Sequence, residues 1–239
     1  MEEALRHGKS RTAGKFVEWL LGNDNQKELI TTIFDETLAA AFSKSVRKSI
    51  QIFKADEGRI VFSDVFPGVE IELGINAMNL WSLNGGYNNY LATSPTGTAI
   101  DFDDGVFIID DQSQDAKAAN NIITLKKHWD WFTNTMLSRL VTAGKITFIK
   151  TKRYSKKLTG VTEKEAKKIV YEVKHISIRA ETLEMDTMLC ESIQNKKEYR
   201  RKMKTMGADI ASANYQQEPI DLKGRLYQKF STYETRSNY

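Results

Sequence analysis

The sequence predicts an α/β fold, with a mainly parallel sheet and helices on both of its faces. Short apolar runs alternate along the chain with longer segments whose apolar residues recur every three or four positions, the spacing of amphipathic helices. One short run, residues 106–109, is wholly apolar and is followed by two aspartates, a pattern that is typical of a fully buried parallel strand. Strands that alternate with helices form a parallel sheet, because each crossover helix returns the chain to the end of the sheet where the previous strand began.

The first half of the chain predicts a helix, a strand and a second helix, followed by an irregular region. Residues 10–21 have helical spacing and end at the turn signal Gly22-Asn23-Asp24-Asn25. Residues 28–34 (ELITTIF) read as a strand because they are apolar and β-branched. The helix that follows places these residues on one face: Leu38, Phe42, Val46, Ile50 and Phe53. Residues 58–98 are rich in Gly, Asn and Ser, and we expect small strands at residues 59–62, 69–73 and 90–93.

The second half predicts further strands and helices in alternation. After the strand at 106–109, one face of a long helix is formed by Ile122, Leu125, Trp129, Phe132, Met136 and Leu140. Strands are expected at residues 145–150 (KITFIK) and 175–180 (HISIRA), and a charged helix at 195–206. The tail beyond Tyr215 has little periodicity.

Composition excludes several classes of protein. The chain has 239 residues, of which 41% are hydrophobic, so one principal domain is expected. A net charge of +4 lacks the dense positive field of a histone-like protein. The single cysteine, Cys190, excludes an internal disulfide framework or a cysteine-based zinc site and suits a reducing compartment. We expect no membrane partner, because no apolar stretch approaches the ~18 residues of a membrane span.

The tetrapeptide His7-Gly8-Lys9-Ser10 opens a predicted helix and ends as a phosphate-binding loop does. In such a loop, backbone N–H groups at the helix N-terminus cradle phosphate oxygens. The lysine reaches the outer phosphates of ATP, and the serine hydroxyl binds Mg²⁺. The pattern departs from the full motif, because Glu3 stands where a small residue is usual and the strand that feeds the loop is expected to be missing.

The predicted strand at 106–109 delivers Asp110 and Asp111 to the carboxyl edge of the sheet, where ligands bind in open α/β folds. In phosphate-loop ATPases, the first carboxylate of such a pair holds Mg²⁺ and the second orients the attacking water. The alternative is a solvated aspartate pair at a strand end. A Gly-Lys-Ser about a hundred residues upstream favours the catalytic interpretation.

Several segments, in their order and spacing, resemble the large terminase subunits of tailed phages over nearly the whole chain. These segments are Arg6-His7-Gly8-Lys9-Ser10, Phe34-Asp35-Glu36-Thr37-Leu38-Ala39, Ala92-Thr93-Ser94-Pro95-Thr96-Gly97-Thr98-Ala99, Ile108-Ile109-Asp110-Asp111, Trp129-Asp130-Trp131-Phe132 and Ala213-Asn214-Tyr215-Gln216-Gln217-Glu218-Pro219. The resemblance implies a phosphate-loop NTPase fold and an ATPase that drives double-stranded viral DNA into the procapsid.

The resemblance also assigns roles and partners. The nucleotide-binding residues would be Arg6, His7, Gly8, Lys9 and Ser10. Ser10 and Asp110 would hold Mg²⁺ beside ATP, and Asp111 would be catalytic. The implied partners are viral DNA, the portal protein, the small terminase subunit and further copies of the chain in a ring. The implied location is the cytoplasm of a bacterial host.

Residues 151–154 occupy the place of the family's coupling motif, a threonine and an arginine followed by an aromatic residue. Thr151, Lys152 and Arg153 are the candidates for this motif. Either Lys152 replaces the arginine, or Arg153 is the arginine and one residue is missing before Leu158-Thr159-Gly160.

By the resemblance, residues 1–215 form the ATPase domain without its first strand, and residues 216–239 lead toward a nuclease domain that the chain lacks. Asp101, Asp103 and Asp104 add negative charge near the expected phosphates, which opposes nucleotide binding. We therefore expect the isolated chain to be a weak or inactive ATPase. The alternative function is an inactive or split terminase fragment, such as a prophage remnant, that needs another polypeptide. A phosphate-loop kinase is a more distant third.

Two further groups have two interpretations each. The aromatic residues Trp129, Trp131 and Phe132 could stack on bases, but aromatics at helical spacing are more often core. A basic run is formed by Lys196, Lys197, Arg200, Arg201, Lys202 and Lys204. This run either contacts DNA phosphates or is a solvated helix face.

Overall fold

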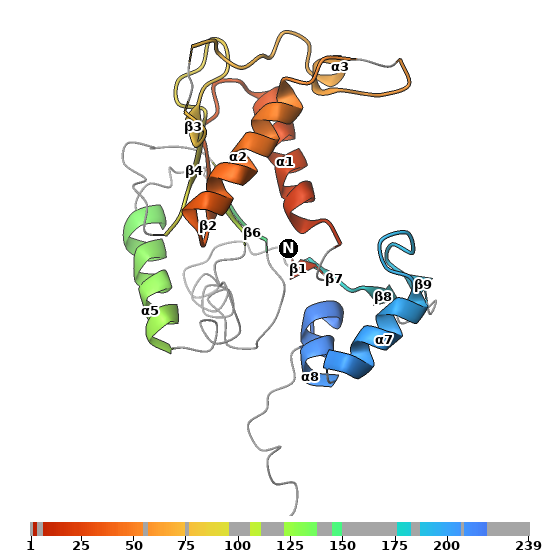
Figure 1. Ribbon diagram of the computed structural model, residues 1–239. Coiled ribbons are helices and arrows are strands. Elements are labelled where there is room, and N and C mark those ends of the chain that lie inside the picture. Colours follow the sequence, from red (N-terminus) through yellow and green to blue (C-terminus); the bar gives the residue numbers. More distant parts are fainter. Residues whose placement is uncertain are drawn as a thin grey trace, which may run out of the picture.

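The computed structural model describes residues 2–3, 7–54, 57–74, 77–95, 106–110, 122–137, 145–149, 176–182, 187–206 and 208–218 (Figure 1). Over these residues the fold is α/β, built on a five-stranded sheet with helices on both faces. Two further sheets of two strands each lie outside it. Among the described helices, none is long and apolar enough to cross a membrane.

The five-stranded sheet is parallel except at one edge. Its strands are β3 (Leu80–Trp81), β4 (Tyr90–Thr93), β2 (Leu29–Ile33), β5 (Val106–Asp110) and β6 (Lys145–Ile149), in that spatial order. β3 runs antiparallel to β4, and all other neighbours are parallel. The prediction that the strands near residues 34, 110 and 150 are neighbours is confirmed.

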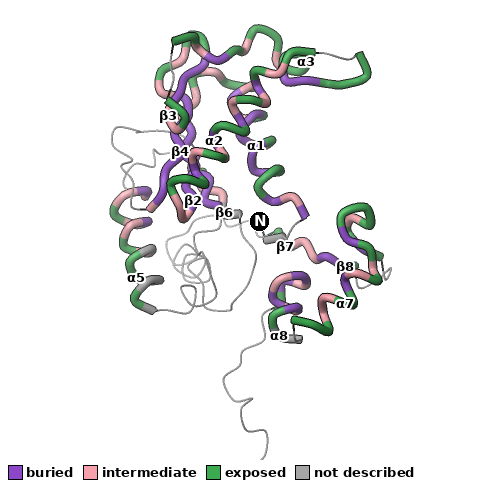
Figure 2. Tube along the Cα trace, in the orientation of Figure 1, coloured by how far each residue is buried: buried purple, intermediate pink, exposed green. Residues whose placement is uncertain are grey.

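Each face of this sheet has its own hydrophobic core. Alternate strand residues Val106 and Ile108 pack in a cluster with Ala13 and Val17 of α1 (Lys9–Asn23) and with residues of α2 (Glu36–Ile50). Phe107 and its alternating neighbours pack on the other face, against α5 (Ile122–Trp131) and its π-helical continuation η1 (Phe132–Met136). Figure 1 shows α1 and α2 on one side of the strands and α5 on the other. Two covered faces explain why every residue of β2, β4 and β5 is buried (Figure 2).

The helices lie close to their predicted positions. Asp35 caps α2, because its Oδ1 accepts a hydrogen bond from the Leu38 N–H at 3.0 Å. The predicted long helix is α5 continued by η1 as far as it is described, and Leu140 lies outside the described residues. Phe132 is buried and Trp129 packs beside it at 5.7 Å between ring centroids, so these aromatics belong to the core.

The described C-terminal part forms a third cluster. It contains β7 (Ser177–Ile178), β8 (Glu181–Thr182), β9 (Thr187–Met188), α7 (Lys196–Met206), α8 (Ala208–Ala211) and η3 (Ser212–Gln216). Ala180, Met188, Tyr199 and Tyr215 are buried together. The charged helix predicted at 195–206 is confirmed as α7, which Figure 1 shows beside β8 and β9.

The N-terminus contains a short strand that the sequence did not predict. β1 (Glu2–Glu3) pairs in parallel with β7, Glu2 opposite Ser177 and Glu3 opposite Ile178. β1 lies outside the five-stranded sheet, so it is not the loop-feeding strand that was expected to be missing. β7 is shorter than the strand predicted at 175–180 and belongs to this two-stranded sheet. Parallel pairing uses backbone groups alone, so two glutamates can form a strand without an apolar pattern.

Two of the small strands predicted between residues 58 and 98 are wrong. Residues 59–62 contain no strand, and a short helix, α3 (Phe62–Val65), begins there instead. Asp64 stabilises the start of α3, because its Oδ2 accepts a hydrogen bond from the Val61 N–H at 3.0 Å. Residues 69–73 contribute only an isolated bridge between Ile71 and Leu83. The strand predicted at 90–93 is confirmed as β4.

The loop before β4 is held by one buried amide side chain. Asn89 is fully buried, and its Oδ1 accepts a hydrogen bond from the Leu83 N–H at 2.8 Å. Its Nδ2 donates to the carbonyls of Asn25 at 2.7 Å and Lys27 at 3.2 Å. Asn89 therefore joins the turn after α1, the entry to β2 and the edge of the sheet.

We expect Asn89→Asp to lower the free energy of unfolding by about 3 kcal/mol, because a buried carboxylate would face two carbonyls that it cannot donate to. Urea unfolding followed by circular dichroism measures this loss. Asn84 is exposed in the same loop, so Asn84→Asp serves as the control and should change stability by less than about 0.5 kcal/mol. Equal losses in the two variants would contradict the role of Asn89.

Candidate functional site

The N-terminus of α1 has the backbone geometry of an anion-binding loop. Gly8 is the N-cap residue, with φ 102° and ψ 12°, a left-handed conformation that favours glycine. Its carbonyl accepts the first helical hydrogen bond, from the Thr12 N–H at 2.8 Å. Among the described residues, no atom lies within 4 Å of the place where a Cβ on Gly8 would be. Phosphate groups bind at such helix ends, where backbone N–H groups and the helix dipole favour negative charge.

Ser10 of this helix meets Asp110 at the end of β5. The Ser10 Oγ donates a hydrogen bond to Asp110 Oδ2 at 2.9 Å, although 100 positions separate the two residues in the sequence. Asp110 is buried, with 4% of its surface exposed. Its backbone lies level with Ile33 of β2 and Ile149 of β6, so it stands in the middle of three strand ends. The helix N-terminus and the acidic strand end therefore form one site at the carboxyl edge of the sheet.

The oxygens of Ser10 and Asp110 have the chemistry and spacing that suit Mg²⁺. This ion takes oxygen ligands at about 2.0–2.1 Å in octahedral geometry, so that neighbouring ligands lie about 2.9 Å apart. The observed separation of the two oxygens is also 2.9 Å. Mg²⁺ bound with a nucleotide usually takes one or two protein oxygens and completes its shell with phosphates and water. Within the described part of the chain there is no group of three or more His, Cys, Asp or Glu residues that could hold a metal alone.

His7 and Lys9, which carry the imidazole and amine nitrogens of the predicted loop, are also buried at this helix end. His7 is 8% exposed and Lys9 is 9% exposed. Lys9 is the first residue of α1, directly after Gly8. A buried lysine suits the binding of a polyanion, since desolvation strengthens the attraction between opposite charges. The buried Asp110 carboxylate repels a polyanion unless a cation lies between the two.

Half of the predicted site lies outside the described residues. Arg6, Asp111, Thr151, Lys152 and Arg153 are the residues concerned. The roles given to these residues stay predictions.

Glu36 is a residue at this edge that the sequence interpretation missed. It lies in the first turn of α2, and its Oε2 accepts a hydrogen bond from the Ser94 N–H at 3.1 Å. This bond joins the segments that follow β2 and β4, which are parallel neighbours. No local sequence signal identifies this bond, because it depends on β2 and β4 being neighbours in space.

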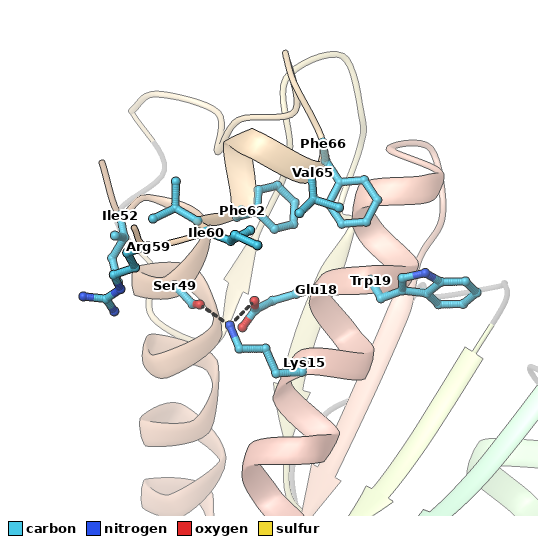
Figure 3. A pocket seen from close by; sticks show the side chains of 11 residues that line it. Lys15, Glu18, Trp19, Ser49, Ile52, Arg59, Ile60, Phe62, Val65 and Phe66 are labelled. Atoms are coloured by element: carbon cyan, nitrogen blue, oxygen red, sulfur yellow. Dashed lines mark hydrogen bonds and ion pairs between the residues drawn. The ribbon is translucent and has the colours of Figure 1, made fainter. Parts of the chain in front are cut away.

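A separate pocket lies away from this site, between α1, α2 and α3 (Figure 3). It has a volume of about 310 Å³ and apolar walls that include Phe62, Val65 and Phe66. On its polar side, the Lys15 Nζ lies 2.7 Å from Glu18 Oε2 and donates to Ser49 Oγ at 2.9 Å. None of the predicted site residues lines it. The Lys15 contact joins the middle of α1 to α2 and so holds α1, whose N-terminus carries Ser10, against α2.

The described geometry defines an α/β protein with a helix N-terminus and a buried carboxylate at the carboxyl edge of a parallel sheet. No protein-family profile matches the chain, and no curated protein is detectably similar to it in sequence.

The left-handed Gly8 gives a direct test of the loop geometry. We expect Gly8→Ala to destabilise the protein by about 1–2 kcal/mol, because the added Cβ is disfavoured at positive φ even where space is open. Gly14, inside α1, is the matched control: a Cβ there would meet Val46 at an ordinary 3.6 Å. Gly14→Ala should stabilise by about 0.5–1 kcal/mol, the helix propensity difference. Urea unfolding measures both, and a neutral Gly8→Ala would contradict the left-handed cap.

Proposed function

We propose that this chain is the ATPase portion of a phage terminase large subunit, which couples ATP hydrolysis to the packaging of double-stranded viral DNA. The observation that carries the proposal is the 2.9 Å hydrogen bond between Ser10 and Asp110. In phosphate-loop ATPases, the loop serine and the carboxylate after the acidic strand are the two protein groups that hold Mg²⁺. The sequence interpretation selected both residues from separate motifs, and the fold brings them together.

The position of the site supports the same proposal. The sheet is parallel through β4, β2, β5 and β6, and open parallel sheets bind ligands at the carboxyl ends of their strands. α1 lies against β5 and β6, so its N-terminus is directed at that edge. The left-handed Gly8 begins the helix there. A nucleotide with its phosphates at Gly8 would have both the helix N-terminus and a buried carboxylate within reach.

The proposed chemistry divides the roles among five residues. Backbone N–H groups from Gly8 onward bind phosphate oxygens, and Lys9 adds a positive charge to the outer phosphates. Ser10 and Asp110 hold Mg²⁺, which neutralises charge on the phosphates when it is bound. Asp111 accepts a hydrogen bond from the attacking water and so orients it toward the terminal phosphate. The aspartate is one methylene shorter than a glutamate, so this water must approach closely or act through a second water.

A second candidate function is an inactive or split terminase fragment that needs another polypeptide. The observation that favours it is the strand before the phosphate loop: β1 has two residues, both glutamates, and belongs to a two-stranded sheet with β7. Carboxylates near the loop oppose the binding of phosphate. A loop that is weakly tethered on its strand side must also lose entropy when nucleotide arrives.

Binding of Mg-ATP tests the nucleotide site. We expect isothermal titration of the chain to give a dissociation constant weaker than micromolar, and Lys9→Ala to weaken binding at least about tenfold further through loss of the charge on the phosphates. Lys44 is exposed on α2, so Lys44→Ala is the charge-matched control and should leave affinity unchanged. If Lys9→Ala and Lys44→Ala bind Mg-ATP as the unmodified chain does, Lys9 has no place in a nucleotide site. Micromolar binding by the unmodified chain would instead exclude the weak-binding fragment.

Turnover tests the water-orienting role of Asp111. The chain is extended at its N-terminus with the loop-feeding strand of a terminase, and phosphate release is measured. Asp111→Asn should lower the rate about 10²- to 10⁴-fold, because the amide cannot accept a proton, while ATP affinity stays largely unchanged. Should Asp111→Asn weaken ATP binding as strongly as it slows release, the carboxylate would be a binding group and not the group that orients water.

A further inference from the structure

The helix α7 presents a continuous stripe of positive charge. Its basic residues Lys197, Arg200, Arg201 and Lys204 fall at positions i, i+3, i+4 and i+7, which lie on one face of a helix. All four are exposed. At about 1.5 Å per residue the stripe is about 10 Å long. We call these four residues the α7 basic stripe.

The opposite face of α7 is fixed by the segment from Tyr215 to Glu218. Tyr199 is buried, and its ring meets that of Tyr215 edge-on at 5.6 Å between centroids. The Gln216 Nε2 donates a hydrogen bond to the Tyr199 hydroxyl at 2.6 Å. Burial raises the pKa of that hydroxyl above its ordinary value. The stripe is therefore held in one orientation by its own helix packing.

Among the described residues, one carboxylate pairs with the stripe. The Arg201 Nη2 lies 2.8 Å from Glu198 Oε1 on the flank of the helix; the Arg201 side chain is 75% exposed and that of Glu198 is 40% exposed. Lys196, which lies outside the stripe, pairs with Glu181 at 3.6 Å. Exposed ion pairs of this kind are weak, on the order of 0.2–1 kcal/mol, so Arg201 can exchange Glu198 for another anion.

The same segment joins α7 to the strand that pairs with β1. The Ala180 N–H donates to the Tyr215 carbonyl at 2.8 Å, and Arg179 forms an ion pair with Glu218. Arg179 directly follows β7, whose partner β1 lies just before the Gly8 loop. Backbone hydrogen bonds thus connect the Tyr215 segment, on which α7 packs, with β7, and β7 with β1.

We propose that the α7 basic stripe binds the phosphate backbone of double-stranded DNA. Duplex DNA carries one phosphate per ~3.4 Å of axis on each strand, a dense line of negative charge that four cations on one exposed helix face can partly neutralise. Single-strand binding would call for exposed aromatic side chains on which bases stack. In the described residues between 176 and 218, both aromatic side chains, Tyr199 and Tyr215, are buried. The choice of a duplex as partner rests on the proposed packaging function.

Fluorescence anisotropy of a labelled duplex of about 25 base pairs tests the proposal, with the full chain titrated at several salt concentrations. The variant replaces Lys197, Arg200, Arg201 and Lys204 with glutamine. We expect its affinity at 0.1 M salt to fall about 10- to 100-fold and the slope of log K against log salt to fall by about 3. The charge-matched control replaces Lys44, Lys48, Lys126 and Lys127, which are exposed on α2 and α5.

The control decides between a site and bulk electrostatics. If the stripe and control variants lose affinity equally, binding follows net charge and the proposal fails. The pair Arg200→Gln and Lys204→Gln, checked by thermal unfolding, guards against a folding defect and should still lower the slope by about 2. A single strand that binds more tightly than the duplex would also overturn the proposal. Mg-ATP titration of the same variants separates the DNA-binding proposal from the ATPase proposal. If the chain binds no ATP but needs the stripe to bind DNA, the ATPase proposal fails and the DNA-binding proposal stands.

Discussion

The in-register parallel pairing of β5 with β2 and β6 is the constraint on which the candidate site depends. It sets the backbone of Asp110 level with Ile33 and Ile149 at one sheet edge. A slip of one residue would move Asp110 by about 3.3 Å and turn its side chain to the other face. The Ser10 hydroxyl could not then reach it. A contact across 100 sequence positions thus follows from hydrogen bonds between three short strands.

The register is in turn set by packing on both faces. Val106 and Ile108 face the core that includes α1, whereas Phe107 and Ile109 face the core that includes η1. Because side chains alternate along a strand, residue 110 has the parity of Val106 and Ile108 and turns toward α1. An apolar run such as Val106-Phe107-Ile108-Ile109 has no polar face to specify its register, so the two different helix layers must do so. The same packing that buries the strand also selects which aspartate meets Ser10.

The parts that sequence could predict are those whose signal is local. Apolar runs identify β2, β4, β5 and β6, helical spacing identifies α1, α2 and α5, and a charged, helix-forming composition identifies α7. Ser10 and Asp110 could be paired because each ends a recognisable motif. β1 could not be found, since its two glutamates carry no apolar pattern and backbone pairing leaves no signal in the sequence. The bond from Ser94 to Glu36 also has no local pattern, as it depends on β2 and β4 being neighbours in space. Residues 59–62 carry an apolar run, but the Asp64 cap gives the chain a helical turn there.

The Gly8 loop is attached to the fold in two unequal ways. On its C-terminal side, α1 buries Ala13, Val17 and Leu21 in the larger core, and Lys15 ties the helix to α2 through Ser49. On its N-terminal side, the described pairing is that of the two residues of β1 with β7. β7 leads within two residues to Ala180, which bonds to the Tyr215 segment beneath α7. Core burial involves far more free energy than two strand pairs. Over the described residues, the Gly8 loop is therefore anchored far more strongly through α1 than through β1.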